Sequence, residues 1–466
     1  MVTECKQESF EFQGLGSRKV EARFDGGTIT SDGGALLFGE VAKRRGILDR
    51  FAGCFDDHRN PDLIEFTVRE LVAQRVYGLI CGYEDLNDHQ ILRSDPLLAS
   101  LVGKEDVTGE KRVRREDKGK ALAGKSTLNR IELAKREFSE EERYKKIICD
   151  EKKVENFFIE EFIRSFKKSP RFLILDFDAK DMPLHGNQED KFYHGYYGHY
   201  CYLPLYVFCN DMPLYAKLRP SNIDASLGTI EALEKIVPCL KEAFPKATIL
   251  VRADSGFARE EIMSWCERNE IHYILGLAKN SRLLTEIQEE LKKAKEEFEK
   301  EKRPARIFKE LEYQTRESWS KPRRVIAKAE HLEKGENPRF IVTSLSEKAS
   351  KAMKLYEKWY CQRGDMENRI KEQLHLFADR MSAGVKRANQ LRLWFSTVAY
   401  LIMTLTRRLT LKNTDLARAR MNTIRGKLIK IGAQVTVSVR RVFVSMASCF
   451  PYQHIFRQAH LAALQI

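Results

Sequence analysis

The stretch Pro170–Asp181, "PRFLILDFDAKD", combines a strongly apolar run with carboxylates at its end. A short apolar run of this kind, rich in branched and aromatic residues, predicts a buried β-strand. Asp176 and Asp178 are two residues apart, so in a strand their side chains lie on the same face. Two carboxylates in so apolar a strand are costly unless something, most simply a cation, compensates their charge. The stretch therefore predicts a central strand and a charged site together.

The segments that follow indicate the fold class. Two more strand-like segments, His199–Phe208 and Met212–Pro220, are joined by a short turn. Helical and strand-like segments then alternate, in the order Leu227–Phe244 (helix), Ala247–Asp254 (strand), Arg259–Glu270 (helix) and His272–Lys279 (strand). Three adjacent strands followed by this alternation predict a mixed sheet covered by helices, an α/β layer architecture.

Asp254 ends the second buried strand, in "TILVRADSGF". The carboxyl ends of strands are where α/β sheets build their sites. Carboxylates on neighbouring strands suit Mg²⁺, a hard cation that takes oxygen ligands. The alternative is that Asp176 and Asp254 only cap turns or pair with Arg252.

A third carboxylate is expected from the segment "WYCQRGDMENRIKEQL", Trp359–Leu374. At 100° per residue, a helix places four of its polar side chains within an arc of roughly 80°. These residues are Tyr360, Arg363, Glu367 and Lys371. Asp365 is expected to point elsewhere. Such a face is too polar for an ordinary core, although a solvated surface with paired charges remains the alternative.

Composition favours a polyanionic partner. The 466 residues include 81 Lys and Arg against 67 acidic residues, a net charge of +14. This excess favours nucleic acid ahead of a membrane surface. The ten cysteines are scattered without a C-x-x-C pair, as in a reducing cytoplasm. The most apolar helical segment, Trp394–Leu405, is shorter than the roughly 20 residues of a membrane span and predicts a buried helix. We therefore expect a cytoplasmic protein without a secretory signal or a membrane partner.

Three motifs, which follow one another along the chain, together resemble those of a known protein family. "DFDAKD", "RADSGF" and "YCQRGDMENRIKE" resemble the motif set of DDE transposases of bacterial insertion sequences. The last is similar to the Y-x₂-R-x₃-E-x₆-K signature of the IS-four-like branch. "HGNQEDKFYHGYYGHYCYLPLYVF" and "KLRPSNIDAS" resemble its thirteen-eighty-type family, so the similarity covers most of the chain.

Two positions depart from these motifs. Seven residues beyond Glu367 stands Leu374 where the signature has Lys. Lys371 lies on the same predicted helical face and is our candidate for the missing contact with the DNA backbone. Lys180 stands where the resemblance leads us to expect Thr, which argues against a hydroxyl group acting there.

The resemblance implies an RNase H-like mixed-sheet catalytic core that is interrupted by a β-rich insertion. It also implies a mainly helical N-terminal region and a helical, basic C-terminal region. We expect residues 1–150 to bind the element ends, 169–284 and 351–411 to form the core, 285–350 to form the insertion, and 412–466 to form the basic region.

The implied function is binding the ends of a mobile element and catalysing Mg²⁺-dependent DNA cleavage and strand transfer, with Mn²⁺ able to substitute. The expected metal ligands and catalytic residues are Asp178, Asp254 and Glu367, with Asp176 as the alternative to Asp178. Tyr360, Arg363 and Lys371 are expected to contact DNA. The implied partners are terminal inverted repeats, target DNA and further copies of the chain, as a homodimer or larger assembly at the nucleoid.

Two other functions remain open. One is an RNase H-like DNA-binding protein that has lost its chemistry. The other is an NTP-dependent DNA enzyme, because "GKALAGKS", Gly119–Ser126, matches the phosphate-binding pattern G-x₄-G-K-[ST]. The preceding "TGEKRVRREDK" is too charged to form the buried strand that a P-loop needs. We therefore interpret the match as a flexible basic loop before a helix.

Lys125→Ala tests this interpretation. We expect DNA cleavage by the variant to stay nearly unchanged and ATP to have no effect, because no buried strand leads into the loop. Cleavage assays with and without ATP measure both effects. A cleavage rate that rises with ATP and collapses in Lys125→Ala would contradict the interpretation.

Overall fold

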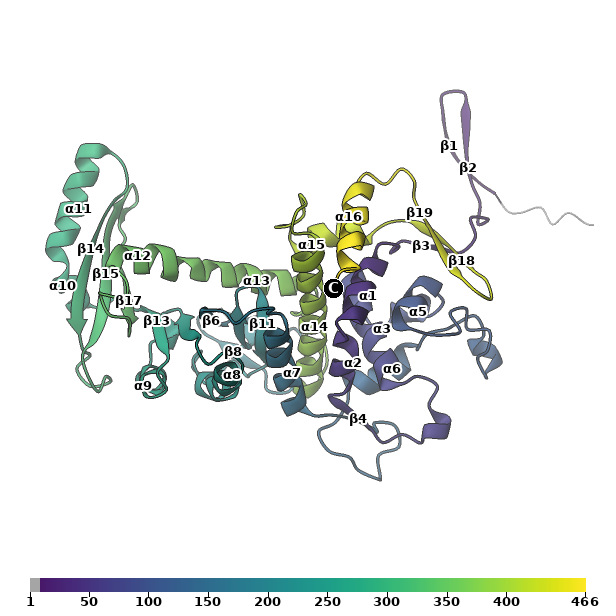
Figure 1. Ribbon diagram of the computed structural model, residues 1–466, viewed down its shortest axis with the longest axis horizontal. Coiled ribbons are helices and arrows are strands. Elements are labelled where there is room, and N and C mark those ends of the chain that lie inside the picture. The colour runs from purple at the N-terminus through teal and green to yellow at the C-terminus, as the bar shows by residue number, and fades with distance from the viewer. Residues whose placement is uncertain (1–8) are drawn as a thin grey trace, which may run out of the picture. The chain divides into compact units, whose positions relative to one another are not determined.

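A computed structural model describes residues 9–466, and the chain packs as two compact units (Figure 1). The central unit consists of Asp49–Asn60 and Arg130–Thr404. The terminal unit combines the residues up to Leu48 with Pro61–Asn129 and Leu405–Ile466. Segments that the sequence analysis treated as separate N-terminal and C-terminal regions thus share one unit. The functional roles predicted for those regions stay predictions.

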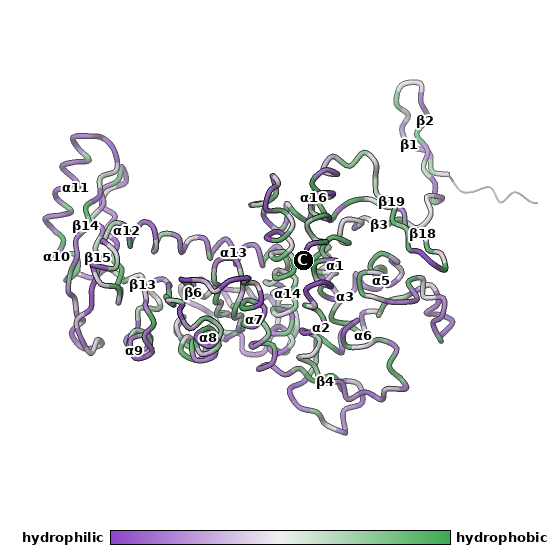
Figure 2. The backbone as a smooth tube through the Cα atoms, in the orientation of Figure 1, coloured by the Kyte–Doolittle hydropathy of each residue, from purple (hydrophilic) through white to green (hydrophobic). Residues whose placement is uncertain are grey.

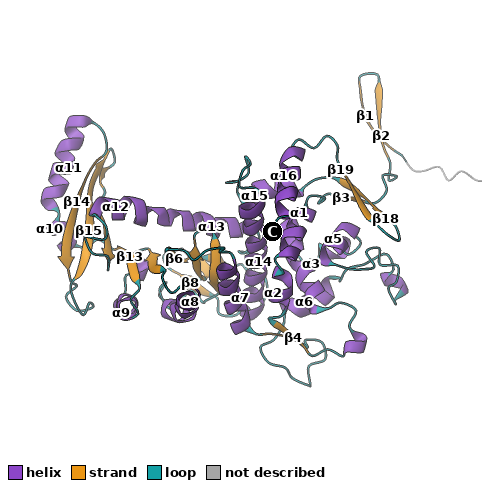
Figure 3. Cartoon of the chain, viewed as in Figure 1, coloured by secondary structure: helices purple, strands orange, loops and turns teal. Residues whose placement is uncertain are grey.

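The central unit is built on a nine-stranded sheet, drawn in orange in Figure 3. In sheet order the strands are β11 (Met212–Lys217), β10 (Leu205–Cys209), β6 (Phe172–Ala179), β12 (Thr248–Ala253), β13 (His272–Leu277), β17 (Arg339–Thr343), β15 (Arg323–Leu332) and β14 (Ala305–Tyr313), with β16 (Gly335–Glu336) beside β15. β6, β12 and β13 are parallel, whereas β10 and β17 run antiparallel to their neighbours. The predicted mixed sheet is confirmed, and its strand order is consistent with an RNase H-like core.

The segment 285–350 extends this same sheet. It begins with the helix α11 (Gln288–Glu301), which follows α10 (Ser281–Glu286). The strands β14, β15 and β17 come next, and β17 pairs along β13, with Gly276 opposite Ile341. A strand edge that would otherwise expose unpaired backbone groups is thereby covered. The strands themselves are predicted from the sequence, but their continuity with the central sheet is not.

Helices pack on the sheet because each buries an apolar stripe. They include α7 (Glu151–Arg164), α8 (Thr229–Ala243) and α9 (Glu260–Arg268). Asp150 caps α7 by accepting hydrogen bonds from the backbone N–H groups of Lys152 and Lys153. A small three-stranded sheet also belongs to this unit, with β7 (Met182–Pro183), β9 (His199–Tyr202) and β8 (Phe192–His194) in that order.

The long helix α14 (Lys386–Thr410) contains the apolar segment noted in the sequence, seen as a green stretch in Figure 2. Trp394 and Tyr400 are fully buried. The Trp394 indole N–H donates to the carbonyl of Ala216 (3.0 Å), and the Tyr400 hydroxyl donates to that of Asp211 (2.9 Å). The prediction of a buried helix is confirmed. Among the helices of residues 9–466, none is both long and apolar enough to cross a bilayer.

The terminal unit is mainly helical. Its longer helices are α1 (Ala35–Arg44), α3 (Val68–Cys81), α5 (Pro96–Val102) and α16 (Gln453–Ala463), with α15 (Met421–Ile424) among the short ones. Thr67 and Glu70 form a reciprocal capping box at the start of α3. Two small sheets complete the unit, one of β1 (Phe10–Leu15) and β2 (Arg18–Ala22), the other of β19 (Val442–Met446), β18 (Ala433–Val437) and β3 (Ile29–Thr30).

A buried carboxylate joins distant parts of the chain within the terminal unit. Asp32 is almost fully buried just before α1. Its Oδ1 lies 2.7 Å from the Lys430 Nζ, and its Oδ2 accepts a hydrogen bond of 2.7 Å from the Tyr83 hydroxyl. The Lys430 ammonium also lies over the Tyr83 ring. Removing Lys430 would leave a buried carboxylate without its cation, so segments nearly 400 residues apart depend on each other.

The P-loop pattern lies in the terminal unit, and no strand of the described chain leads directly into it. The nearest regular element is a 3₁₀ turn at Arg115–Asp117, and the helix α6 (Lys125–Glu132) follows. The Lys125 Nζ donates to the Asn87 side-chain oxygen (3.0 Å), and the Lys125 N–H donates to the Gln90 side chain (3.0 Å). The loop thus precedes a helix, as the sequence predicts, and its lysine is already bound within the chain.

A buried ion pair links the central strands β6 and β12. Asp176 and Arg252 face each other in the parallel ladder and are both about 5% exposed. The Arg252 Nη2 donates to the Asp176 Oδ2 at 2.8 Å, while Nε binds the other carboxylate oxygen. Arg252 also donates to the carbonyl of Trp359. The alternative noted above, that Asp176 pairs with Arg252, is the arrangement found.

Asp176→Asn tests how much this ion pair contributes to the free energy of unfolding. The variant keeps the side-chain volume but leaves the Arg252 charge buried without its counter-charge, so we expect a loss of about 3–5 kcal/mol of unfolding free energy. Urea denaturation followed by circular dichroism measures it. Asp56→Asn is the control, because its pair with Lys153 is about half exposed and contributes about 1 kcal/mol or less. Equal midpoints for parent and Asp176→Asn would contradict the expectation.

Candidate active site

Strand register brings two of the predicted carboxylates to one edge of the sheet. The parallel ladder of β6 and β12 ends with Arg252 opposite Asp176. Continuing that register by two residues places Asp254 beside Asp178. Both therefore lie at the carboxyl ends of neighbouring parallel strands, where α/β sheets build their sites.

Asp178 is a buried carboxyl group at the end of β6. It is 9% exposed, and its Oδ1 accepts a hydrogen bond of 2.9 Å from the Ala179 N–H. Burial raises the pKa of Asp178 to about 7; Asp254 and Glu367 raise it further, while Arg363 and the Ala179 N–H oppose the shift. A carboxyl group with this pKa is only partly ionised near neutral pH and gains much from a nearby cation.

Asp254 directly follows β12 and caps a 3₁₀ turn, Ser255–Phe257. Its Oδ1 accepts a hydrogen bond of 2.8 Å from the Gly256 N–H. The turn-capping role considered in the sequence analysis is therefore present. It occupies one carboxylate oxygen, and within the described chain no hydrogen bond is formed by Oδ2. Asp254 can thus cap the turn and still offer an oxygen to a ligand.

Glu367 lies on a helical run with an irregular beginning, seen from α12 to α13 in Figure 1. α12 (Ala352–Lys354) continues into a π-helical turn at Leu355–Tyr360, a 3₁₀ turn at Cys361–Arg363 and then α13 (Gly364–Leu374). The uniform 100° step assumed from the sequence is therefore wrong for the first half of the run. π-helical turns inside helices are frequent at functional sites.

Arg363 connects the helix to the strand edge. Its Nη1 lies 3.8 Å from the Asp178 Oδ2, and its Nη2 lies 3.7 Å from the Glu367 Oε1. Burial acts to lower the pKa of Arg363, but Asp178, Tyr360, Asp254 and Glu367 raise it overall. Two of the predicted carboxylates therefore contact one guanidinium group, and the charge of the third, Asp254, also acts on it. Glu367 itself is about half exposed, so it remains open to solvent.

Gly276 is a residue that the sequence analysis missed. It lies on β13 beside Asp254, and a β-carbon there would be 2.5 Å from the Tyr360 hydroxyl and 2.8 Å from the Ser255 nitrogen. Any side chain would displace Tyr360 or the turn after β12. The signal was an isolated glycine in the apolar strand "HYILGLAK", which is typical of a close backbone approach.

Tyr197 is a second residue that was missed. It lies in the loop between β8 and β9, where its ring contacts those of His194 and Tyr196. Burial raises the pKa of Tyr197 to about 12, and Asp181, Asp178 and Asp254 contribute. Its phenol group is therefore within electrostatic range of the strand-end carboxylates. No local pattern distinguishes it from the neighbouring tyrosines.

The remaining predicted residues lie outside this cluster. Asp176 is committed to Arg252, and burial raises its pKa. Lys371 is exposed on α13 and forms no ion pair with any described carboxylate. Asp365, expected to point elsewhere, is exposed, but its charge still acts on Asp176.

The carboxylate oxygens of the cluster are candidate ligands for a metal. Within residues 9–466, no three His, Cys, Asp or Glu side chains are gathered closely enough to hold an ion as they stand. Asp178 and Glu367 instead contact Arg363. Three carboxylates at one sheet edge are nevertheless the oxygen donors that Mg²⁺ prefers, so the residue types fit that metal.

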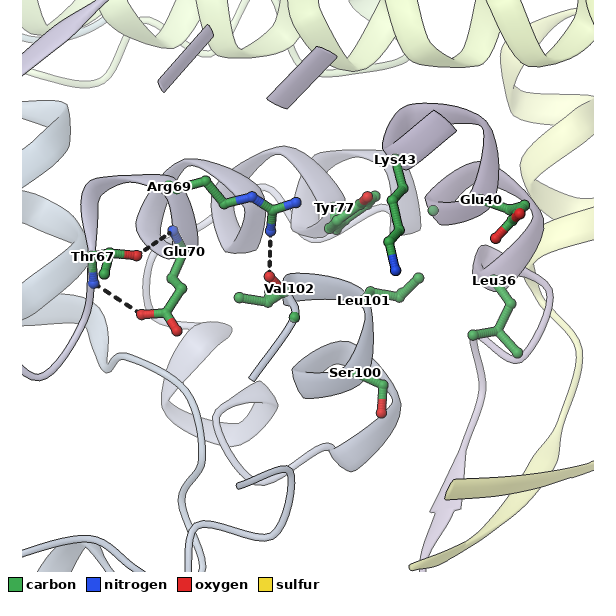
Figure 4. A pocket seen from close by; sticks show the side chains of 12 residues that line it. Leu36, Glu40, Lys43, Thr67, Arg69, Glu70, Tyr77, Ser100, Leu101 and Val102 are labelled. Carbon is green, nitrogen blue, oxygen red and sulfur yellow. Dashed lines mark hydrogen bonds between the residues drawn. The ribbon is translucent and has the colours of Figure 1, made fainter. Parts of the chain in front are cut away.

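Each of the two compact units contains a cavity. One of about 580 Å³ lies in the terminal unit, lined by residues such as Lys43, Arg69 and Tyr77 (Figure 4). There Arg69 donates to the Val102 carbonyl and the Thr67–Glu70 capping box is intact. A smaller cavity, of about 300 Å³, borders the carboxylate cluster and is lined in part by Ser255 and Gly276. Only the second belongs to the candidate site.

Comparisons with known proteins place the chain in a family. A family model described as "Transposase DDE domain group 1" matches residues 12–466. No curated protein sequence matches significantly. Among solved structures, the chain is similar to a piggyBac transposase determined by cryo-EM as a synaptic complex with hairpin DNA. That similarity has 12% identity and a TM-score of 0.38, covering 85% of this chain and 79% of the other. Because the family match extends over nearly the whole sequence, the protein belongs to the DDE transposases and is a DDE-type DNA transposase.

Proposed function

We propose that this transposase binds the ends of a mobile element and catalyses Mg²⁺-dependent DNA strand cleavage and transfer. The observation that carries the proposal is that Asp178 and Glu367 both contact Arg363, while the strand register leads Asp254 to the end of the neighbouring strand. These three carboxylates would hold the metal, with Mn²⁺ able to substitute. Bound divalent ions supply activation of the attacking water or 3′-hydroxyl and stabilisation of the leaving oxygen.

Asp178 rather than Asp176 is the proposed ligand from β6. The Asp176 carboxylate and the Arg252 guanidinium already compensate each other in a two-bond ion pair, and moving Asp176 would leave Arg252 buried without a counter-charge. Asp178 has only a loose contact of 3.8 Å with Arg363. Binding a metal through Asp178 therefore costs less free energy than binding it through Asp176.

Arg363 and Tyr360 would bind the DNA phosphates. The distances from Arg363 to Asp178 and Glu367, 3.8 and 3.7 Å, are longer than hydrogen bonds, so neither carboxylate binds the guanidinium group tightly. Arginine can bind two phosphate oxygens at once, which suits it to orient a scissile phosphate. Gly276 would position Tyr360 by leaving room for its hydroxyl. Lys371, exposed on α13, would contact the backbone further along.

Finer assignments complete the proposal. We assign the protein to the IS-four-like branch and its thirteen-eighty-type family, on the motifs quoted above. Residues 1–150 would bind terminal inverted repeats, and 285–350 would form the insertion characteristic of the branch. The protein would act on target DNA as a homodimer or larger assembly at the nucleoid. Incubation of the purified protein with DNA that carries the flanking element ends, with and without Mg²⁺, tests the activity directly.

The two alternatives receive less support. An RNase H-like protein that had lost its chemistry would not need to keep Asp178 and Glu367 beside the same arginine with Asp254 on the neighbouring strand, because repulsion between carboxylates is costly. An NTP-dependent enzyme would need a strand before Gly119 and a lysine available to phosphates, whereas Lys125 binds Asn87.

Glu367→Gln separates binding from cutting. Glutamine keeps the size and helix propensity but removes the charge that a metal ligand needs. We expect the variant to bind element ends at least as well as the parent and to cut them at least about 100-fold more slowly, because ligand loss removes metal-dependent catalysis. Gel-shift and cleavage assays measure the two effects. Glu297→Gln, an exposed position on α11, is the matched control and should cut normally. Equal cleavage by parent and Glu367→Gln would remove this residue from the site.

Asp178→Asn tests the electrostatics without relying on activity. Because the folded-state pKa of Asp178, about 7, lies above its ordinary value of 3.8, the folded chain holds a proton that the unfolded chain has lost between these pH values. The parent therefore loses stability as pH rises from about 4 to 7, whereas the variant does not lose this contribution. We expect Asp178→Asn to be more stable than the parent in metal-free buffer at pH 8 by at least about 1 kcal/mol, and by much less at pH 5.

Thermal unfolding with a chelator, and then with added Mg²⁺, provides the measurement. Mg²⁺ should stabilise the parent at pH 8 and have little effect on Asp178→Asn. A stability difference that is the same at both pH values would contradict the assigned pKa. Equal stabilisation of both proteins by Mg²⁺ would exclude Asp178 as a ligand.

A further inference from the structure

The hairpin of β18 and β19 ends in a tip that the fold does not explain. It is drawn in yellow as part of the terminal unit in Figure 1. The Ser438 N–H donates to the Arg441 carbonyl at 2.8 Å, so the turn consists of only Val439 and Arg440. Val439 is fully exposed, and Arg440 and Arg441 are exposed as well. Neither arginine forms an ion pair with any described residue.

The turn residues are a poor choice for making a turn. Two-residue hairpin turns favour Gly, Asn or Asp, which readily adopt the positive φ angles that match the strand twist. Val439 and Arg440 are neither of these types nor among the described residues with positive φ. A β-branched apolar side chain in full contact with water adds nothing to stability. Residues that do not suit the local structure they occupy, as Val439 and Arg440 do not suit this turn, are expected at functional sites.

The exposed face of the hairpin is suited to a polyanion. The register places Thr436 opposite Phe443 and Gln434 opposite Ser445, and all four are exposed. This face carries hydroxyl and amide groups and one aromatic ring, without an acidic residue. The same bias extends to residues 412–466, which contain nine Lys and Arg but only one acidic residue, Asp415. These residues therefore carry more than half of the net charge of the chain.

We propose that the tip of the β18–β19 hairpin inserts into the DNA minor groove. The groove is about 6 Å wide, so the narrow two-residue tip fits where a whole strand pair would not. Arg440 and Arg441 would enter its negative potential, which is strongest in A·T-rich segments. Val439 would act as an apolar wedge against a base step and bend the duplex. The inference rests on the proposed DNA partner but uses none of the proposed catalytic residues.

The double variant Arg440→Ala/Arg441→Ala tests the contact. The probes are a labelled A·T-rich duplex and a G·C-rich duplex of equal length, titrated by fluorescence anisotropy at rising salt. We expect the parent to prefer the A·T-rich duplex and to be displaced by distamycin, a minor-groove ligand. The double variant should bind at least about tenfold more weakly, with a salt slope smaller by up to about 2. Lys292→Ala/Lys295→Ala on α11 removes the same charge from a helix whose lysines lie beside glutamates and should bind like the parent.

Val439→Ser separates the wedge from the charge. This variant keeps both arginines, so we expect its salt slope to match the parent and its bending of an end-labelled duplex, measured by energy transfer, to be reduced. Circular dichroism of each variant should match the parent, since the tip buries nothing.

The outcomes distinguish the inference from the function on which it rests. Parent protein that binds neither duplex would overturn the DNA partner itself. Parent binding that the double variant retains in full would overturn only the hairpin contact. Binding that distamycin does not weaken would exclude the minor groove. Unchanged DNA binding with a loss of self-association in light scattering would assign the tip to a protein interface and overturn the proposal.

Discussion

The ion pair between Asp176 and Arg252 is the constraint on which the central unit depends. Both groups lie in the middle of the sheet, where an uncompensated charge is very costly. The two strands can therefore pair only in a register that brings these side chains together. That register carries Asp178 and Asp254 to the same edge two residues later. Arg252 also donates to the carbonyl of Trp359, so it anchors the π-helical turn of the helical run that bears Glu367.

A cluster of carboxylates is an electrostatic liability unless a cation is present. Burial raises the pKa of Asp178, and the charges of Asp254 and Glu367 raise it further. Arg363 provides a partial remedy through contacts that are too long for hydrogen bonds. The repulsion between these carboxylates is therefore only partly compensated. A divalent cation bound to them would compensate it further, and Arg363 would then be available to a phosphate. Such sites are where strongly shifted pKa values are expected to gather.

The fold could be predicted from the sequence where a local pattern determines it. The strand ending in Asp178, the alternation of helices and strands, and the buried helix at Trp394 all follow from runs of apolar residues. The parts that depend on pairing between distant segments could not be predicted in this way. β17 joins β13 through backbone bonds that leave no trace in either segment, so the continuity of the sheet was missed.

The same limit applies to the candidate site. Asp254 and Glu367 have recognisable surroundings, whereas Gly276 matters because of a tyrosine more than eighty residues later in the chain. Tyr197 is one of several neighbouring tyrosines, and only the packing of its loop distinguishes it. The π-helical turn before Arg363 also escaped prediction, since helical periodicity was assumed to be uniform.

The contact between Asp32 and Lys430 has a consequence for biosynthesis. Chains generally fold from the N-terminus as they leave the ribosome. Here, however, the first helices need a cation that is translated nearly 400 residues later. The terminal unit therefore cannot close until Lys430 has been translated. A ribosome that stalls early would release a chain whose central sheet can form while its terminal unit stays open, and such a product would be a ready substrate for cellular proteases.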